Sequence, residues 1–271
     1  MSRTERIRAA FGKAAGHYDG QASVQQQVAR HVADLAMQAV AEMREGVVSG
    51  EDQPCLRNDG RLRILEIGCG TGELTGHIRA LLPDADIVAT DISPEMIAEA
   101  QRKLGDDICF MQMDGENPCF HQPVFDLILS SLCFQWFNDL PAALGRLVHL
   151  LNDQGRLIFS TMADRSFIEW RQAHNRCNMI VGTPAYPMME ELAAIMASYK
   201  DSQLWEEQYA WDFGGARGLL AHLKAIGATV PVEGRVALRA GKMRQVMRAF
   251  DEQGGVCTYH IAYGKIIKNQ S

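Results

Sequence analysis

The stretch Ile64-Leu65-Glu66-Ile67-Gly68-Cys69-Gly70-Thr71-Gly72 decides the fold of this chain. Its first four residues are mostly branched and apolar, as in a buried strand, and three glycines at alternate positions follow. The apolar spacing of Leu74, Ile78 and Leu81 then predicts a helix that ends before Pro83. We therefore expect a strand, a tight turn and a helix N-terminus, whose free N–H groups form a polar cradle.

The spacing of the glycines separates two kinds of ligand. Dinucleotide sites carry G-x-G-x-x-G, in which the third glycine lets the helix pack on the strand. This chain has G-x-G-x-G, with Glu66 in front and Glu73 behind. Two carboxylates disfavour a pyrophosphate but suit a cation that carries an amino-acid tail. On this motif alone, a turn of another nucleotide-binding fold stays open as the alternative.

Composition excludes several classes of protein. The 271 residues, of which 47% are hydrophobic and 22% charged, suit one large α/β domain with a cap. No run of eighteen apolar residues occurs and the N-terminus carries mixed charge, so we expect a cytoplasmic protein without a membrane segment. The seven cysteines form no C-x-x-C pair and the eight histidines show no ligand spacing, which predicts free thiols and no metal site.

The net charge of −6 is distributed unevenly. Between Gly214 and Phe250, seven basic residues stand against one acid, Glu233, so this segment carries +6 and the remainder −12. A basic segment on an acidic protein indicates an anionic partner. The alternative is a helix whose solvated face is rich in arginine and lysine.

The N-terminal part is predicted to be helical over residues 1–43, with a break at Gly16-His17-Tyr18-Asp19-Gly20, and residues 44–60 read as a loop. The break is suited to covering a pocket, or else it is a turn with a half-buried tyrosine.

Two further strands end in acids. The run 87–91 ends in Asp91, nineteen residues after Gly72, and a carboxylate at a strand end can accept hydrogen bonds from a ribose diol. The run 108–113 is followed by Asp114 and Gly115, which suit the amino group and a ring nitrogen of adenine. Strands at 125–131 and 157–161 alternate with helices, so we predict an α/β fold with a doubly wound, mostly parallel sheet.

The E-x-G-x-G-x-G motif, Asp91, Asp114 and the strand at 125–131 together resemble the class I S-adenosylmethionine (SAM) methyltransferases over residues 60–161. The resemblance implies a Rossmann-like, seven-stranded sheet with strands at 203–211 and 257–267, the last one antiparallel. It implies SAM as the cofactor, with the acid of the motif near its ammonium group. The implied cofactor-binding residues are Glu66, Gly68, Gly70, Gly72, Asp91, Ile92, Asp114, Gly115 and Ser130.

A narrower resemblance covers nearly the whole chain. The runs Ala10–Ala15, Leu132–Trp136 and Leu223–Ala228, with Tyr259 and Tyr263-Gly264, resemble the malonyl-[acyl-carrier protein] O-methyltransferases of biotin synthesis. That family methylates the free carboxyl of malonyl carried on acyl-carrier protein or coenzyme A, which masks its charge for the fatty-acid enzymes. The chain departs from the family pattern in the long insertion at 44–60 and at residues 152–155, where many relatives have a Pro-Gly-Gly turn.

The implied chemistry needs alignment more than proton transfer. A carboxyl group with a pKa near ~4 is already ionised at neutral pH, so no general base is required. We expect Tyr18 and Gln135 to close over the methyl donor and touch the acceptor. We also expect a cation to orient the acceptor carboxylate. The candidates, which the sequence does not rank, are Arg165, Arg171, Lys224 and Arg235.

The predicted organisation is a helical cap and loop at 1–60, a SAM-binding core at 61–161, and the rest of the sheet at 162–271 with a helical substrate lid at about 212–250. Three other functions stay open: a class I methyltransferase acting on a quinone precursor or a free dicarboxylic acid, a nucleic-acid methyltransferase, and a SAM-binding protein without catalysis. The second is disfavoured because Ser131-Leu132-Cys133-Phe134 replaces the Asn/Asp-Pro-Pro-aromatic signature, so no nucleic-acid partner is expected.

Overall fold

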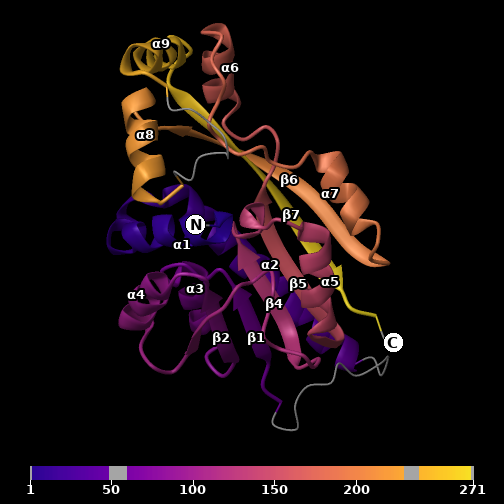
Figure 1. Cartoon of the computed structure of the whole chain (residues 1–271). Helices are drawn as coiled ribbons and strands as arrows, with labels where there is room; N and C mark the ends of the chain where they lie inside the picture. The colour runs from indigo at the N-terminus through magenta and orange to yellow at the C-terminus, as the bar shows by residue number, and fades with distance from the viewer. Residues whose placement is uncertain (1, 49–59, 229–237, 270–271) are drawn as a thin grey trace.

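The protein is built on one seven-stranded sheet in the order β3-β2-β1-β4-β5-β7-β6, seen in a computed structural model that describes residues 2–48, 60–228 and 238–269 (Figure 1). β1 to β5 pair in parallel, whereas β7 runs antiparallel to both β5 and β6. The strands are β1 Arg63–Ile67, β2 Asp86–Asp91, β3 Cys109–Gln112, β4 Phe125–Ser131, β5 Leu151–Met162, β6 Asp201–Asp212 and β7 Val256–Ile267. The predicted fold class and the antiparallel last strand are confirmed.

Helices cover both faces of this sheet. The helices are α1 Arg3–Ala14, α2 Ser23–Val48, α3 Glu73–Leu81, α4 Pro94–Leu104, α5 Leu140–His149, α6 Ile168–Arg176, α7 Met189–Met196, α8 Ala216–Ala225 and α9 Ala240–Asp251, with short 3-10 turns η1 Ala15–His17, η2 Asp19–Gln21 and η3 Phe134–Trp136. Side chains alternate between the faces along each strand, so Ile64 packs in one core with α2 and α3, while Leu65 packs in the other with α5. The chain is therefore doubly wound, as predicted.

Two boundaries differ clearly from the prediction. α2 continues to Val48, although residues 44–60 were expected to form a loop; residues 49–59 lie outside the described part. β5 begins at Leu151, six residues before its predicted start, because Gln154 with φ of +61° forms an irregularity that keeps the strand paired. The Gln154 N–H donates to the Lys268 carbonyl at 2.8 Å, and the Lys268 N–H donates back to Gly155 at 2.9 Å. A bulge thus stands where many relatives have the Pro-Gly-Gly turn.

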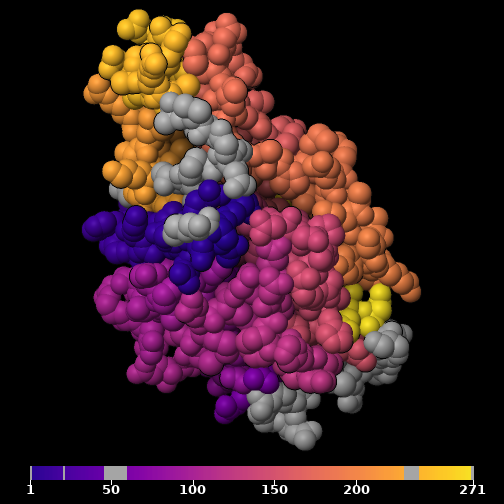
Figure 2. Space-filling model, in the orientation of Figure 1, coloured from indigo at the N-terminus to yellow at the C-terminus, as the bar shows by residue number. Residues whose placement is uncertain are grey.

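The upper end of the sheet, in the view of Figure 1, carries the added elements. β6 and β7 extend past the carboxyl ends of the other strands, and α6, α8 and α9 lie around this extension. The end of α8 approaches α1, since a Cβ at Gly227 would lie 3.0 Å from the Ala10 carbonyl oxygen. Figure 2 shows the indigo N-terminal residues between the magenta core and orange α8. The division at residues 60 and 161 stays a prediction.

Among the described residues, no helix is both long and apolar enough to span a bilayer. The same part of the chain contains no group of three or more histidine, cysteine, aspartate or glutamate side chains arranged to hold a metal ion.

Candidate functional site

The glycine turn after β1 leaves bare backbone at the carboxyl end of the sheet. Gly68, Gly70 and Gly72 have φ of +72°, +55° and +89°, a region that strains residues with side chains. A Cβ at Gly68 would lie 2.5 Å from the Cys133 Sγ, whereas a Cβ at Gly70 would meet nothing within 4 Å. Gly70 therefore faces open space, and Gly72 begins α3 as its N-cap. The turn has the close approach to backbone that the motif predicts.

Asp91 joins this turn to the end of β2. Its Oδ2 accepts a hydrogen bond from the Gly70 N–H at 3.0 Å, and its Oδ1 accepts one from the Ser93 N–H at 2.8 Å. Burial raises the pKa of Asp91, and these backbone donors oppose the rise. Each carboxylate oxygen still has a lone pair for a further donor, which is the chemistry that a ribose diol needs.

Glu66 and Ser130 lie behind the turn instead of lining the pocket. Glu66 is 2% exposed, and its Oε2 accepts a hydrogen bond from the Thr75 hydroxyl at 2.6 Å. Burial raises the pKa of Glu66 to about 7. The Ser130 hydroxyl donates to the Ile67 carbonyl oxygen at 3.0 Å. Both side chains support the strand ends from below, and direct contact with a ligand stays a prediction for them.

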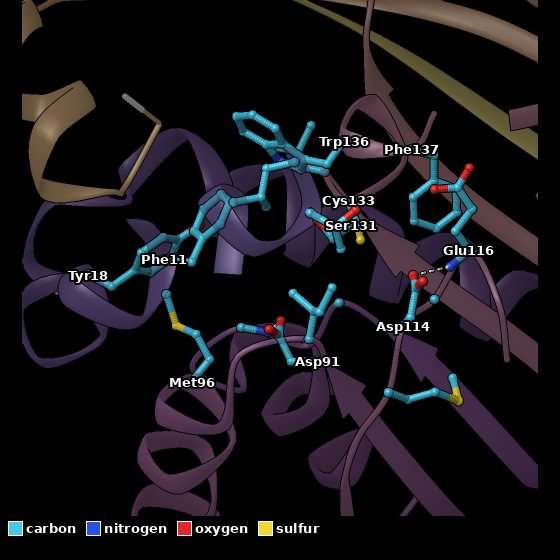
Figure 3. A pocket seen from close by; sticks show the side chains of 18 residues that line it. Phe11, Tyr18, Asp91, Met96, Asp114, Glu116, Ser131, Cys133, Trp136 and Phe137 are labelled. Atoms are coloured by element: carbon cyan, nitrogen blue, oxygen red, sulfur yellow. Dashed lines mark hydrogen bonds between the residues drawn. The ribbon is translucent and has the colours of Figure 1, made fainter. Parts of the chain in front are cut away.

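A pocket of about 760 Å³ of empty space opens above these strand ends (Figure 3). Asp91 and Asp114 point into it from one side, and Phe11 and Trp136 lie on the opposite side. The predicted residues that line it are Gly68, Gly70, Asp91, Ile92, Asp114 and Gly115. Only glycine fits at position 115, since a Cβ there would lie 2.4 Å from the Ile67 side chain.

This pocket fits SAM. Asp114 stands at the end of the β3 segment, and its Oδ1 accepts a hydrogen bond from the Glu116 N–H at 3.0 Å, which fixes the carboxylate. Apolar side chains of Met96, Met113 and Phe137 line the space around it, as a flat base requires. The two strand-end acids and the open Gly70 thus offer partners for an adenine, a ribose and an amino-acid tail.

α1 forms a wall of this pocket, which the sequence did not reveal. Thr4, Ile7 and Phe11 line the pocket from α1. The Phe11 and Trp136 rings meet edge to face with centroids 5.3 Å apart, and the Arg3 Nη1 donates to the Trp136 carbonyl oxygen at 2.7 Å. The apolar stripe of Ile7 and Phe11 is the available signal, but it is equally typical of a helix that packs on the core.

A second pocket, with about 530 Å³ of empty space, adjoins the first. The residues that line both pockets are Phe11, Tyr18, Leu132 and Trp136. Gln135 lines the second pocket alone; its Nε2 donates to the Leu132 carbonyl oxygen at 2.6 Å. Of the two residues predicted to lie between donor and acceptor, Tyr18 therefore lies in the wall common to both pockets, whereas Gln135 lines only the second and contacts the shared Leu132.

Known proteins similar to this chain agree with a methyltransferase site. A family model described as "Methyltransferase domain" matches residues 65–157. The malonyl-[acyl-carrier protein] O-methyltransferase of Magnetococcus marinus is 35% identical over 268 residues, which cover 97% of this chain and 92% of that protein. The chain belongs to the malonyl-[acyl-carrier protein] O-methyltransferase family. The biotin biosynthesis bifunctional protein BioCD of Bordetella avium is 37% identical over 255 residues. These residues cover 94% of this chain but only 50% of that protein's length.

Solved structures place this family member in the class I methyltransferase fold. The YcgJ protein of Bacillus subtilis matches with a TM-score of 0.55 at 18% identity, covering 78% of this chain and 93% of that one. The plantazolicin methyltransferase BpumL, solved in complex with S-adenosylhomocysteine, matches with a TM-score of 0.50 at 17% identity over 98% of both chains. At such identities the likeness shows the shared fold.

The basic residues expected to anchor the acceptor lie elsewhere in this family member. The Arg165 Nη2 pairs with the Glu206 Oε1 at 2.5 Å, and Arg171 donates to the Asp164 carbonyl oxygen. Lys224 is exposed on α8, and Arg235 lies outside the described residues. None of the first three lines either pocket. Their role as anchors stays a prediction.

Proposed function

We propose that this protein transfers a methyl group from SAM to the free carboxylate of a malonyl thioester, giving the methyl ester used in biotin synthesis. The observation that carries the proposal is the pair of adjoining pockets with Tyr18 in their common wall. The first pocket has the acids and glycines of a SAM site, and the second is bounded mainly by apolar side chains. The family relatives, named for malonyl-[acyl-carrier protein], supply the identity of the acceptor.

When bound, SAM supplies an activated methyl group on a positively charged sulfur. The acceptor carboxylate, ionised at neutral pH because its pKa lies near ~4, needs no base. Its oxygen forms the new bond to the methyl carbon as the carbon–sulfur bond breaks, and the electron pair of that bond stays on sulfur. The protein's task is to hold the reacting atoms in line, which can account for roughly 7–11 kcal/mol of the barrier.

We assign the roles by position. Asp91 would accept from the ribose hydroxyls, Asp114 from the adenine amino group, and the backbone at Gly68 and Gly70 would receive the amino-acid tail. Tyr18, in the wall common to both pockets, and Gln135, in the second pocket, would orient the acceptor. Glu66, buried beneath the turn, would favour the cation above it through its charge.

The parts of the chain take complementary roles in this proposal. Residues 1–60 would cap the cofactor, residues 61–161 would bind it, and residues 162–271 would complete the sheet and carry a lid at about 212–250. Leu223 of α8 and Ile226, the residue directly after α8, line the second pocket, which supports a lid over the acceptor. The acyl-carrier protein, or coenzyme A in its place, would dock beside this lid.

A methyl-transfer assay with labelled SAM tests the proposal. It compares malonyl-carrier protein, malonyl-coenzyme A and the two acetyl thioesters, which lack the free carboxylate. We expect label only on the malonyl forms, as the methyl ester. Absence of transfer to every thioester, with SAM binding verified by calorimetry, would contradict the acceptor and favour another small carboxylate or phenol.

A further inference from the structure

The second pocket holds two buried polar atoms that have no hydrogen-bond partner. These are the Oε1 of Gln25, on α2, and the hydroxyl of Thr183, on the segment between α6 and α7. The two residues stand far apart in the chain, yet both line the same pocket. Buried polar groups without a partner are rare and unfavourable, so each requires an explanation.

The wall of the second pocket is uncharged, which limits the kinds of group that the two unpartnered atoms could bind. The lining residues that the structure describes include no lysine, arginine, aspartate or glutamate. Their polar side-chain groups are amides and hydroxyls, namely those of Tyr18, Gln25, Gln135, Thr183, Tyr186 and Tyr259, and the indole N–H of Trp136. Several of these are already engaged: Tyr259 Oη pairs with the His222 Nε2 at 2.9 Å, and Gln135 with Leu132. Thr183 and Gln25 are the ones whose buried atoms lack a partner.

Both positions can present a hydrogen-bond donor to a carboxylate. A threonine hydroxyl donates one hydrogen bond, and a carboxylate oxygen is a strong acceptor for it. A half-turn of the Gln25 amide exchanges its oxygen with its NH₂ group, so this position can also present a donor. The pocket therefore offers two uncharged donors beside the wall that it shares with the SAM pocket.

We propose that Thr183 and Gln25 bind the acceptor carboxylate, so that it is held by neutral hydrogen bonds without an arginine or lysine partner. This inference rests on the proposed function and identifies residues that set its specificity for a free carboxylate.

The reaction itself favours neutral donors. The carboxylate loses its negative charge as its oxygen bonds to the methyl carbon. A guanidinium beside it would stabilise the charged reactant more than the transition state, in which that charge is disappearing, and would slow the reaction. Hydroxyl and amide donors also orient the carboxylate, but because they are neutral they stabilise the charged reactant over the transition state by a smaller amount. The balancing positive charge in the site is then that of the methyl donor.

The test compares Thr183→Val, which keeps the shape but removes the hydroxyl, with Thr183→Ser, which keeps the hydroxyl. We expect T183V to lower kcat/KM for malonyl-coenzyme A about tenfold or more, mainly through KM, as for loss of a hydrogen bond to a charged group. T183S should stay near wild type. Calorimetry should give weaker malonyl-coenzyme A binding to T183V, with the affinities for S-adenosylhomocysteine and for the uncharged methyl-ester product unchanged.

Gln25→Leu provides a second variant should T183V fold poorly, and Arg171→Ala tests a cationic anchor. Wild-type kinetics in both T183V and Q25L would overturn the inference, as would a tenfold loss of malonyl-coenzyme A affinity in R171A alone. A wild-type enzyme that methylates no malonyl thioester would overturn the proposed function itself, so the two failures are distinct.

Discussion

Among single residues, Glu66 links the stability of the ligand-free protein to pH. Burial raises its pKa from the ordinary 4.5 to about 7, although the Thr75 hydroxyl opposes the rise. A carboxyl whose pKa is higher in the folded state stabilises that state below pH 4.5, and this contribution is lost as the pH rises through about 7. The difference between these two pKa values corresponds to a change in the free energy of unfolding on the order of 3 kcal/mol.

Glu66→Gln should therefore raise the free energy of unfolding at pH 8, because glutamine cannot ionise in the buried site. Urea unfolding of both proteins between pH 4.5 and pH 8 measures this: the curves should be similar at the acidic end and diverge as Glu66 ionises. We also expect weaker SAM binding by the variant, since the negative charge beneath the turn is gone. Parallel pH profiles for the two proteins would contradict the assignment.

The hydroxyl of Tyr18 gives a second prediction for a single residue. Burial raises the pKa of Tyr18, and the nearby Asp91 adds to the rise, so the hydroxyl stays protonated and able to donate. Tyr18→Phe removes only that hydroxyl. We expect kcat to fall by roughly tenfold, the value of one hydrogen bond to a charged group, with the unfolding temperature nearly unchanged. Tyr199→Phe, outside both pockets, is the matched control, and equal kinetics for wild type and Y18F would end the idea.

Among the secondary-structure elements, the break between α1 and α2 is tied to the glycine turn. The Thr71 hydroxyl donates to the Asp19 Oδ1 at 2.5 Å, and Lys103 of α4 pairs with the Asp19 Oδ2. The Lys103 Nζ also donates to the Thr71 carbonyl oxygen at 3.2 Å. Because Asp19 follows Tyr18 directly, this clasp of Asp19, Thr71 and Lys103 positions the tyrosine over the pocket.

Opening the clasp should affect both binding and turnover. Asp19→Ala should raise KM for SAM and lower kcat several-fold, and Lys103→Ala should do so less strongly. The double variant should cost less than the sum of the two, with a coupling energy of about 1 kcal/mol in a double-mutant cycle. Arg102→Ala breaks a solvent-exposed pair with Glu99 on the same helix and is the control, expected to leave the kinetics unchanged. Additive effects of D19A and K103A would refute the clasp.

Local sequence patterns predicted some parts of the fold and the site, but not those that depend on contacts between distant segments. Asp91, Asp114 and the glycines were predicted because a strand end and its following turn are local patterns. The contact of Phe11 with Trp136, and the placement of Gln25 and Thr183 around one pocket, join segments distant in the chain, so no spacing rule encodes them. The doubly wound, mostly parallel sheet followed from the alternation of helices and strands. The early start of β5 did not, because it depends on pairing across the sheet and with Lys268.

Across the protein as a whole, the lid is basic whereas the remainder of the chain is acidic. The basic residues of α8, α9 and the residue before α9 are Arg217, Lys224, Arg239, Lys242, Arg244 and Arg248. All six are exposed, and none forms an ion pair with another described residue. α9 turns Val246 and Phe250 inward, so its basic side chains face outward. This surface adjoins the second pocket through α8 and suits an acidic carrier protein.

Reversing two of these charges should separate docking from chemistry. Arg239→Glu combined with Arg244→Glu should raise KM for malonyl-carrier protein at low salt, because a long-range attraction is replaced by repulsion. KM for malonyl-coenzyme A should change less and kcat hardly at all, since neither residue lines a pocket. The salt dependence of kcat/KM for the carrier substrate should weaken as well.

Lys200→Glu is the matched control: this exposed lysine precedes β6, whereas α8 follows the other end of that strand. An equal loss in K200E, or an unchanged salt dependence in the double variant, would remove the α8–α9 surface as the docking site and leave the carrier to approach from another side of the second pocket.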